Sequence, residues 1–103
     1  MLTDMPKQTY QNYWTLDMLD IRQLKTLAAI KETGSLAEAA QRLHLTQSAL
    51  SHQLKDLENQ LDLPLLIRKT RPPQFTKAGE HLLNLADKVL PLLRETERDL
   101  AKL

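Results

Sequence analysis

Polar side chains suited to hydrogen bonding gather in one short stretch of this 103-residue chain. Gln47, Ser48, Ser51, His52 and Lys55 supply amide, hydroxyl, imidazole and ammonium groups. On a helix, which turns by about 100° per residue, these side chains fan across one face. Amides, hydroxyls and imidazoles can pair with base edges in a DNA groove, and an ammonium can pair with a phosphate. The stretch therefore predicts a helix face that reads duplex DNA.

An ordinary solvated surface is the alternative interpretation of this face. Solvent-facing helices usually mix Lys with Glu, whereas the first carboxylates after Thr46 belong to Asp56 and Glu58. Thr46 itself is predicted to cap the start of the helix. The opposite face is apolar and has helical spacing: Leu50, Leu54, Leu57 and Leu61. One face is thus predicted to pack on a core while the other is free to bind.

Another helix, which precedes this one in the chain, is predicted to begin at Ser35 and to hold it in position. Ser35 and Glu38 have the spacing of a capping box, and Gly34 is suited to end the preceding helix, predicted over residues 19–33. The helix that begins at Ser35 contains small residues that allow a close helix crossing: Ala37, Ala39 and Ala40. His44 lies at the corner, where a residue with left-handed backbone often ends a helix. The two helices are predicted to form a helix-turn-helix.

A basic loop follows this helix pair. Residues 65–67 and 74–76 are predicted to be short strands around a proline-containing tip. The positive residues are Arg68, Lys69, Arg71 and Lys77. No acid lies between Asp62 and Glu80, and the whole chain has a net charge of only +1, so the positive charge is local. A solubilising loop is one interpretation; the other is a wing that contacts phosphates or a narrow minor groove.

The order of these features resembles the N-terminal DNA-binding domain of LysR-type transcriptional regulators. The resemblance begins near Leu19, and it rests on residues 35–58, Leu66-Ile67-Arg68 and Phe75-Thr76-Lys77-Ala78-Gly79-Glu80. It implies a mainly α fold, a winged helix-turn-helix with a three-helix core and a two-stranded wing, followed by a long linker helix. Within the family, residues 48–53 are most similar to the regulators of methionine biosynthesis.

The resemblance also implies which residues contact DNA. Base contacts are implied for Gln47, Ser48, Ser51 and His52, and a minor-groove contact for Arg71. The complete predicted DNA-binding set is Ser35, Thr46, Gln47, Ser48, Ser51, His52, Lys55, Arg68, Lys69 and Arg71. Many family members have Pro in place of Ser48 and Arg in place of His52. Replacing Arg by His removes a permanent charge and a bidentate guanine contact, so the preferred base there stays open.

The chain is predicted to have three segments: residues 1–17 as a mobile extension, 18–76 as the winged helix-turn-helix, and 77–103 as a linker helix. A helix over residues 77–102 is about 39 Å long at 1.5 Å per residue, longer than a small domain can cover. We therefore expect a homodimer, antiparallel according to the resemblance, that binds an interrupted inverted repeat in duplex DNA. The predicted dimer residues are Leu82, Leu85, Ala86, Val89, Leu92, Leu93 and Leu100. Pro91 predicts either a kink near Asp87 or a helix that ends before it.

Other functions find little support in the sequence. Ser51 and His52 point about 100° apart and lack the third group of a catalytic triad, so no catalytic activity is expected. The chain has no cysteine, and His44, His52 and His81 lack metal-ligand spacing, so no metal or cofactor is expected. The resemblance implies an effector, with homocysteine as the first candidate, only for a C-terminal domain that we expect to be missing. A helical dimeric protein-interaction module without specific DNA binding is the alternative function.

The sequence has no apolar run long enough for a membrane span. It also has no signal-like segment at its start. We therefore expect no membrane partner and a bacterial, cytoplasmic, nucleoid-associated protein.

Overall fold

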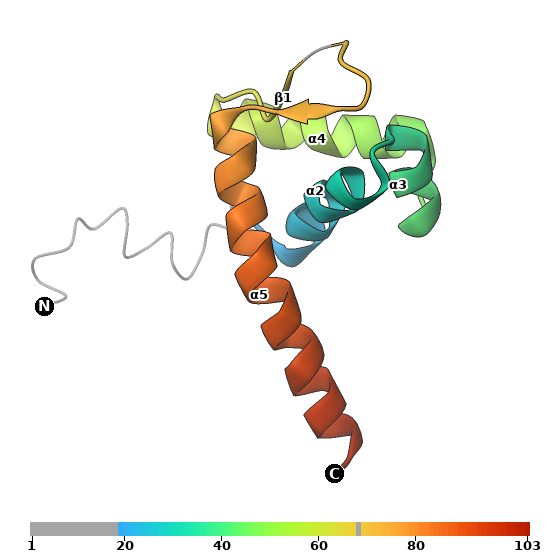
Figure 1. Ribbon diagram of the computed structural model, residues 1–103, viewed down its shortest axis with the longest axis vertical. Coiled ribbons are helices and arrows are strands. Elements are labelled where there is room, and N and C mark those ends of the chain that lie inside the picture. The colour runs from blue at the N-terminus through green and yellow to red at the C-terminus, as the bar shows by residue number, and fades with distance from the viewer. Residues whose placement is uncertain (1–18, 68) are drawn as a thin grey trace, which may run out of the picture.

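The computed structural model describes residues 19–67 and 69–103 (Figure 1). The elements are α2 (Ile21–Thr33), α3 (Leu36–Arg42), α4 (Gln47–Leu61), β1 (Leu66–Ile67), β2 (Gln74–Phe75) and α5 (Lys77–Ala101). This arrangement confirms the predicted mainly α fold with a two-stranded wing and a long final helix. The predictions for residues 1–17 and for Arg68 lie outside the described residues.

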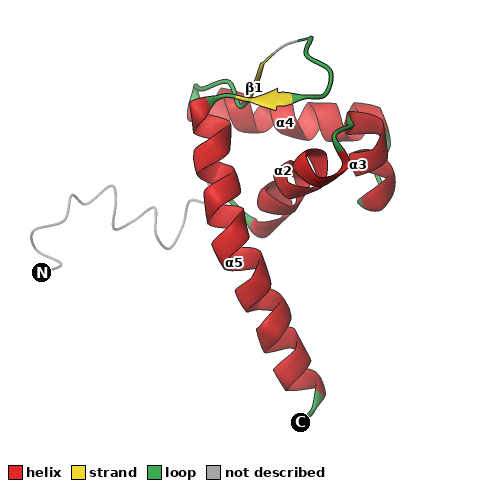
Figure 2. Ribbon diagram, viewed as in Figure 1, coloured by secondary structure: helices red, strands yellow, loops and turns green. Residues whose placement is uncertain are grey.

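The hydrophobic core joins α2, α3, α4 and the first half of α5. Its largest fully buried side chains are Leu27, Ile30, Leu50, Leu57 and Leu65. Ala39 and Ala40 of α3 are also buried, which agrees with a close helix crossing. Figure 2 shows the wing beside α4, at the end of the molecule opposite to the C-terminus.

The helix predicted over residues 19–33 begins at Ile21, because Asp20 caps it. The Asp20 carboxylate accepts a hydrogen bond from the Gln23 amide at 3.0 Å, and the Gln23 side chain accepts one from the Asp20 amide at 2.8 Å. The hydrogen bond from the Gln23 amide, together with the nearby Arg22 guanidinium, lowers the pKa of Asp20. The helix ends at Gly34, as predicted, with a left-handed backbone at φ 69°.

The capping box predicted at Ser35 is only half formed. Ser35 Oγ accepts a hydrogen bond from the Glu38 amide at 3.2 Å. The Ser35 amide, however, lies 3.3 Å from Thr33 Oγ1, and this hydroxyl takes the place that the Glu38 carboxylate was expected to occupy. The start of α3 is therefore fixed partly by the last turn of α2.

The corner between α3 and α4 has the predicted geometry. His44 adopts a left-handed backbone at φ 59°. Thr46 Oγ1 accepts a hydrogen bond from the Ala49 amide at 3.0 Å and caps α4. These two residues turn the chain so that α4 packs across α3 and presents its polar face outward.

The end of α4 is tied to the wing by a carboxylate. Glu58 Oε2 accepts hydrogen bonds from the backbone amides of Leu65 at 2.7 Å and Leu66 at 3.4 Å. From the sequence alone, Glu58 is only a late charge on the polar face. This carboxylate instead fixes β1, and through it the wing, relative to α4.

A close approach of α5 to β1 requires glycine. Thr76 Oγ1 donates to the Pro64 carbonyl at 2.6 Å and accepts from the Gly79 amide at 3.1 Å, so it caps α5 and holds it to the loop before β1. A Cβ on Gly79 would collide with the Leu65 carbonyl oxygen and lie 3.1 Å from the Phe75 ring. Gly79 thus sets the distance between α5 and the wing.

Helix α5 has 25 residues and is about 37 Å long at 1.5 Å per residue. It continues through Pro91, so the alternative in which the helix ends before Pro91 is wrong. Helix α5 packs against α2, and every residue from position 91 onward is exposed. Figure 1 shows the C-terminal end of α5 extending away from the other helices. None of the described helices has the length and apolar character needed to cross a membrane.

Candidate nucleic-acid interface

Four predicted base-contacting residues lie together on α4. Gln47, Ser48, Ser51 and His52 line one shallow hollow of the surface, and all four are exposed. Leu50, Leu54 and Leu57 are buried on the other side of the same helix. The structure therefore presents short donors and acceptors on a rigid element whose apolar side is fixed by the core.

The wing is a closed antiparallel hairpin. Leu66 pairs with Phe75 and Ile67 with Gln74. Thr70 Oγ1 donates to the Ile67 carbonyl at 3.1 Å and accepts from the Gln74 amide at 3.0 Å, so this hydroxyl closes the loop. The sequence alone gives Thr70 no such role, because both of its partners are set by the fold of the hairpin.

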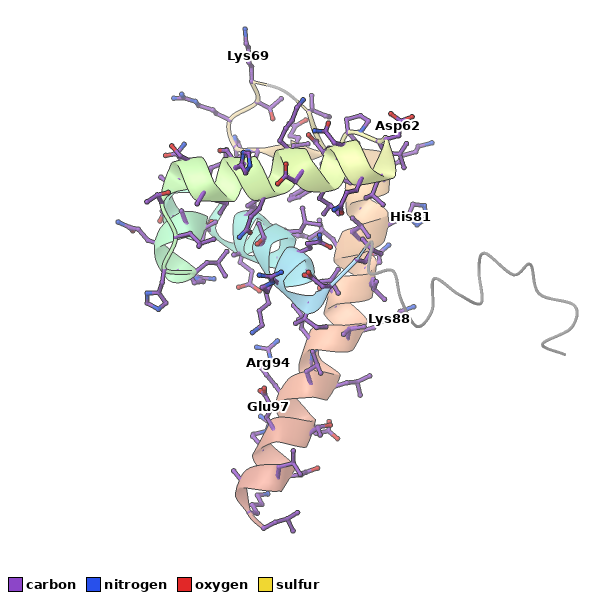
Figure 3. The ribbon with its side chains drawn as sticks, turned by 180° about the vertical axis from the view of Figure 1, so that it is seen from behind. Asp62, Lys69, His81, Lys88, Arg94 and Glu97 are labelled. Carbon is purple, nitrogen blue, oxygen red and sulfur yellow. The ribbon has the colours of Figure 1, made fainter. Side chains whose placement is uncertain are left out.

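Positive charge is carried at the tip of this hairpin. Lys69 has a left-handed backbone at φ 58°. Figure 3 shows its side chain at the tip of the wing, pointing away from the helical body. An exposed ammonium in this position can reach a phosphate without displacing any packed group.

Two hollows connect α4 with the wing and bring the predicted residues together. One is lined by Ser51 and Lys55 of α4 and by Lys69 and Thr70 of the wing. The other is lined by Ser35, Gln47 and Arg71, among others. Thr46 is exposed at the start of α4, and Arg68 lies outside the described residues. Nine of the ten predicted DNA-binding residues are described, and all of them except Thr46 line three hollows that share Gln47 and Ser51.

One side-chain contact on this face was not predicted. His52 Nε2 lies 3.5 Å from Asp56 Oδ2, and both side chains are exposed. The signal was present in the sequence, since residues four apart are neighbours on a helix surface. Asp56 therefore belongs to the surroundings of the proposed base-contacting residues.

The predicted dimer residues differ in how far they are exposed. Ala86 is only 1% exposed, and Leu82 packs against the core of its own chain. Ala86 therefore packs inside its own chain, whereas Leu82 is half-buried and keeps part of its surface accessible. The others are half-buried or exposed: Leu85, Val89, Leu92, Leu93 and Leu100.

The exposed half of α5 borders a groove beside α2. Ile21 and Ala28 of α2 and Leu90 and Leu93 of α5 line it. Arg94 also borders the groove, as does Glu97, and Figure 3 shows both on the same side of α5. This part of α5 carries apolar surface that its own domain does not cover.

The part of the chain that carries this face matches a known protein family. Residues 21–80 match the sequence profile described as bacterial regulatory helix-turn-helix protein, lysR family. The chain is 57% identical over 84 residues to the HTH-type transcriptional regulator MetR of Haemophilus influenzae, which covers 82% of this chain. The match covers 27% of that regulator, so the chain spans about a quarter of its length.

Solved structures with a similar fold include DNA complexes. The CbnR DNA-binding domain bound to DNA has a TM-score of 0.67 and 38% identity, and the match covers 82% of this chain and 98% of that one. The BenM DNA-binding domain bound to benA site 1 DNA has a TM-score of 0.73 and 30% identity, covering 82% and 94% respectively.

Proposed function

Because the chain belongs to the LysR family of bacterial regulatory helix-turn-helix proteins, we propose that it binds DNA sequence-specifically as part of a transcription regulator. One observation carries the proposal: the polar hollow on α4 adjoins the basic wing, so groups suited to bases lie next to groups suited to phosphates. The alternative interaction module is not favoured, because neighbours with a similar fold include DNA complexes.

In this proposal, α4 lies in the major groove. Gln47 pairs with adenine or another base edge, while Ser48 and Ser51 supply short hydroxyls that permit close approach. Lys55 and Lys69 contact phosphates on either side of the groove. Arg71, which lines the same hollow as Gln47, reaches toward the adjacent minor groove.

A homodimer through α5 completes the proposed DNA-binding unit. Leu92 and Leu100 are 63% and 61% exposed, and leucines of this kind on a helix that extends beyond its domain favour pairing with a second copy. Two linked domains bind more tightly than one, because the second contact is intramolecular. The proposed target is therefore an interrupted inverted repeat in duplex DNA.

The proposed target genes are inferred from relatives with similar sequences. Similarity to regulators named MetR, together with the match at residues 48–53, supports genes of methionine biosynthesis as targets. The effector, for which homocysteine is our first choice, would bind outside the chain described by this sequence. We place the protein in the bacterial cytoplasm, at the nucleoid, where duplex DNA is available.

Selection of bound duplexes from random DNA at physiological salt tests the proposal. We expect enrichment of one half-site in two inverted copies with a fixed spacing, since α5 sets the distance between the two α4 helices. Recovery of sequences without a shared motif would contradict sequence-specific binding. A single half-site without its inverted partner would contradict the dimer alone.

A further inference from the structure

Glu58 places a carboxylate beside the proposed DNA-binding face. It lines the hollow between α4 and the wing, together with Lys55 and Lys69. An acid among cations that are proposed to contact phosphates lowers the attraction of this surface for DNA. A role for Glu58 in binding must therefore come from what its carboxylate holds, and not from contact with the duplex.

The carboxylate is engaged by backbone amides of the loop that follows α4. Glu58 is half-buried, and its Oε2 accepts a hydrogen bond from the Leu65 amide at 2.7 Å and a longer one from the Leu66 amide at 3.4 Å. The shorter distance is typical of an ionised acceptor. The backbone carbonyl of Glu58 also accepts from the amides of Asp62 and Leu63. One residue of α4 thus holds this loop at four amides.

Leu65 is the point at which the wing joins the helical body. Its side chain is fully buried, and its carbonyl accepts a hydrogen bond from the Thr76 amide at 3.0 Å. Glu58 holds the same residue from the side of α4. β1 begins at the next residue, where Leu66 pairs with Phe75. The direction in which the hairpin leaves the body therefore depends on the amide that Glu58 holds.

We propose that Glu58 is a positioning residue for DNA recognition, whose carboxylate holds the wing at the distance from α4 at which both elements contact one duplex. The inference rests on the proposed DNA-binding function and deepens it. Glu58 itself touches neither base nor phosphate; it acts through the cations of the wing, of which Lys69 lies at the tip (Figure 3).

A wing that is held in place brings Lys69 to the duplex whenever α4 enters the groove. The entropy cost of ordering the wing then falls on folding and not on binding. A wing that is not held must be ordered during binding, or its cations stay in solvent and release no counterions from the DNA. Loss of the link to Leu65 should therefore weaken binding to every duplex and lower its salt dependence, although no cation is removed.

Two substitutions at this position separate reach from charge. Glu58→Asp keeps the negative charge, but its side chain is one methylene group shorter and leaves the Leu65 amide beyond hydrogen-bonding distance. Glu58→Gln removes the charge and keeps an acceptor oxygen of equal reach. If Glu58 acts only by its charge, Glu58→Asp binds DNA like the original chain. If Glu58 holds the wing, Glu58→Gln keeps the original salt dependence and Glu58→Asp does not.

Glu95→Asp is the matched control. Glu95 is exposed on the C-terminal half of α5, and the change shortens a helical glutamate by the same methylene group. It accounts for the lower helix propensity of Asp without altering the wing. Circular dichroism at the temperature of the binding measurements identifies the variants that are folded.

The experiment measures dissociation constants of the 103-residue chain for two duplexes over a series of salt concentrations at one pH. One duplex is the tightest binder selected from random DNA, and the other is an unrelated sequence of equal length. Glu58→Asp should bind the selected duplex at least about fivefold more weakly, with a salt slope lower by about one. Glu58→Gln and Glu95→Asp should keep the original slope. An unchanged slope for folded Glu58→Asp would overturn the inference.

A second substitution tests whether Glu58 acts through Lys69. In the original chain Lys69→Ala should lower the salt slope by about one. In the Glu58→Asp background it should lower the slope by less than about half as much, because the ammonium is no longer held against a phosphate. A full effect of Lys69→Ala in that background would also overturn the inference.

Hydrogen exchange of the original chain gives a test that does not depend on the folding of a variant. After correction for sequence effects, the Leu65 amide should exchange at least about tenfold more slowly than the Lys69 amide at the exposed tip of the wing. Equal rates would overturn the inference even if Glu58→Asp failed to fold. Failure of the proposed function looks different, because the original chain would then bind the two duplexes equally.

Discussion

Individual side chains on α4 and its neighbours divide into those that can bind DNA and those that hold the binding surface. Gln47, Ser48 and Ser51 are exposed and line the hollow on α4. Glu58 and Thr76, by contrast, use their oxygen atoms to fix the loop around β1. Substitutions in the first group should therefore alter DNA recognition, whereas substitutions in the second should alter stability.

The change Gln47→Ala tests a proposed base contact. A lost base contact costs about 1–3 kcal/mol, roughly 5- to 150-fold in affinity, for the preferred duplex. Binding to an unrelated duplex should change little, because phosphate contacts remain. Fluorescence anisotropy with both duplexes at one salt concentration measures the two affinities.

Lys69→Ala provides the contrasting result. Loss of a phosphate contact should weaken binding to both duplexes and lower the salt slope by about one. Lys88→Ala is the matched control, since Lys88 is an exposed cation on α5, away from the wing (Figure 3). Equal losses on both duplexes for Gln47→Ala would remove Gln47 from the residues that read bases.

Asp20 gives a prediction for pH-dependent stability. The hydrogen bond from the Gln23 amide and the nearby Arg22 lower the pKa of Asp20 in the folded chain. The charged carboxylate thus stabilises the fold above its unfolded pKa, and this contribution is lost as pH falls through the folded pKa. Asp20→Asn should therefore be less stable than the original chain near pH 7, and the difference should shrink below about pH 4. Urea unfolding at both pH values measures it; a constant difference would show that the charge has no role.

Several residue roles could be predicted from sequence because they depend on local geometry. The caps at Thr46 and Gly34 and the left-handed His44 follow from interactions within a few residues. The roles of Glu58 and Thr70 could not, because their partners depend on how the wing folds back. The half-formed box at Ser35 failed for a related reason, since Thr33 of the preceding helix competes for the same amide.

At the scale of elements, the distance between α5 and the wing depends on one missing Cβ. Gly79→Ala would improve helix propensity by up to about 1 kcal/mol in an open site. Here the added methyl group meets the Leu65 carbonyl and the Phe75 ring, so we expect a net loss of about 1–3 kcal/mol. Thermal unfolding measures the change.

Asn84→Ala is the control for Gly79→Ala. Asn84 is exposed on the same helix, so its replacement by Ala should leave the melting temperature equal or slightly higher. An unchanged or raised melting temperature for Gly79→Ala would show that α5 can move away from β1 without cost.

The elements themselves were largely predictable, but the course of α5 was not. Periodic leucines and caps located the helices, and the basic loop between short apolar stretches located the wing. Pro91 left two possibilities, because a proline removes a backbone hydrogen bond but does not by itself decide whether a helix continues. The sequence also could not show that Ala86, a residue of α5, is buried. Its burial depends on how α5 packs against α2.

At the scale of the whole molecule, α5 extends beyond the domain that it completes. Changing both Leu92 and Leu100 to Lys should weaken the proposed dimer by placing charges in its apolar contact. The fold of each chain should persist, because both side chains are exposed in the single chain. Sedimentation equilibrium should show a shift toward monomer, with helicity by circular dichroism unchanged. An unaltered dimer would place the contact between copies elsewhere.

The central claim is that α4 and the wing form the surface that contacts DNA. Backbone amide signals of the 103-residue chain, followed by NMR during titration with a selected duplex, test it most directly. We predict that the signals of Gln47 to Lys55 and of Lys69 to Arg71 shift most, while those of exposed α5 residues near Lys88 remain in place. Shifts confined to α5, with α4 unperturbed, would contradict the account.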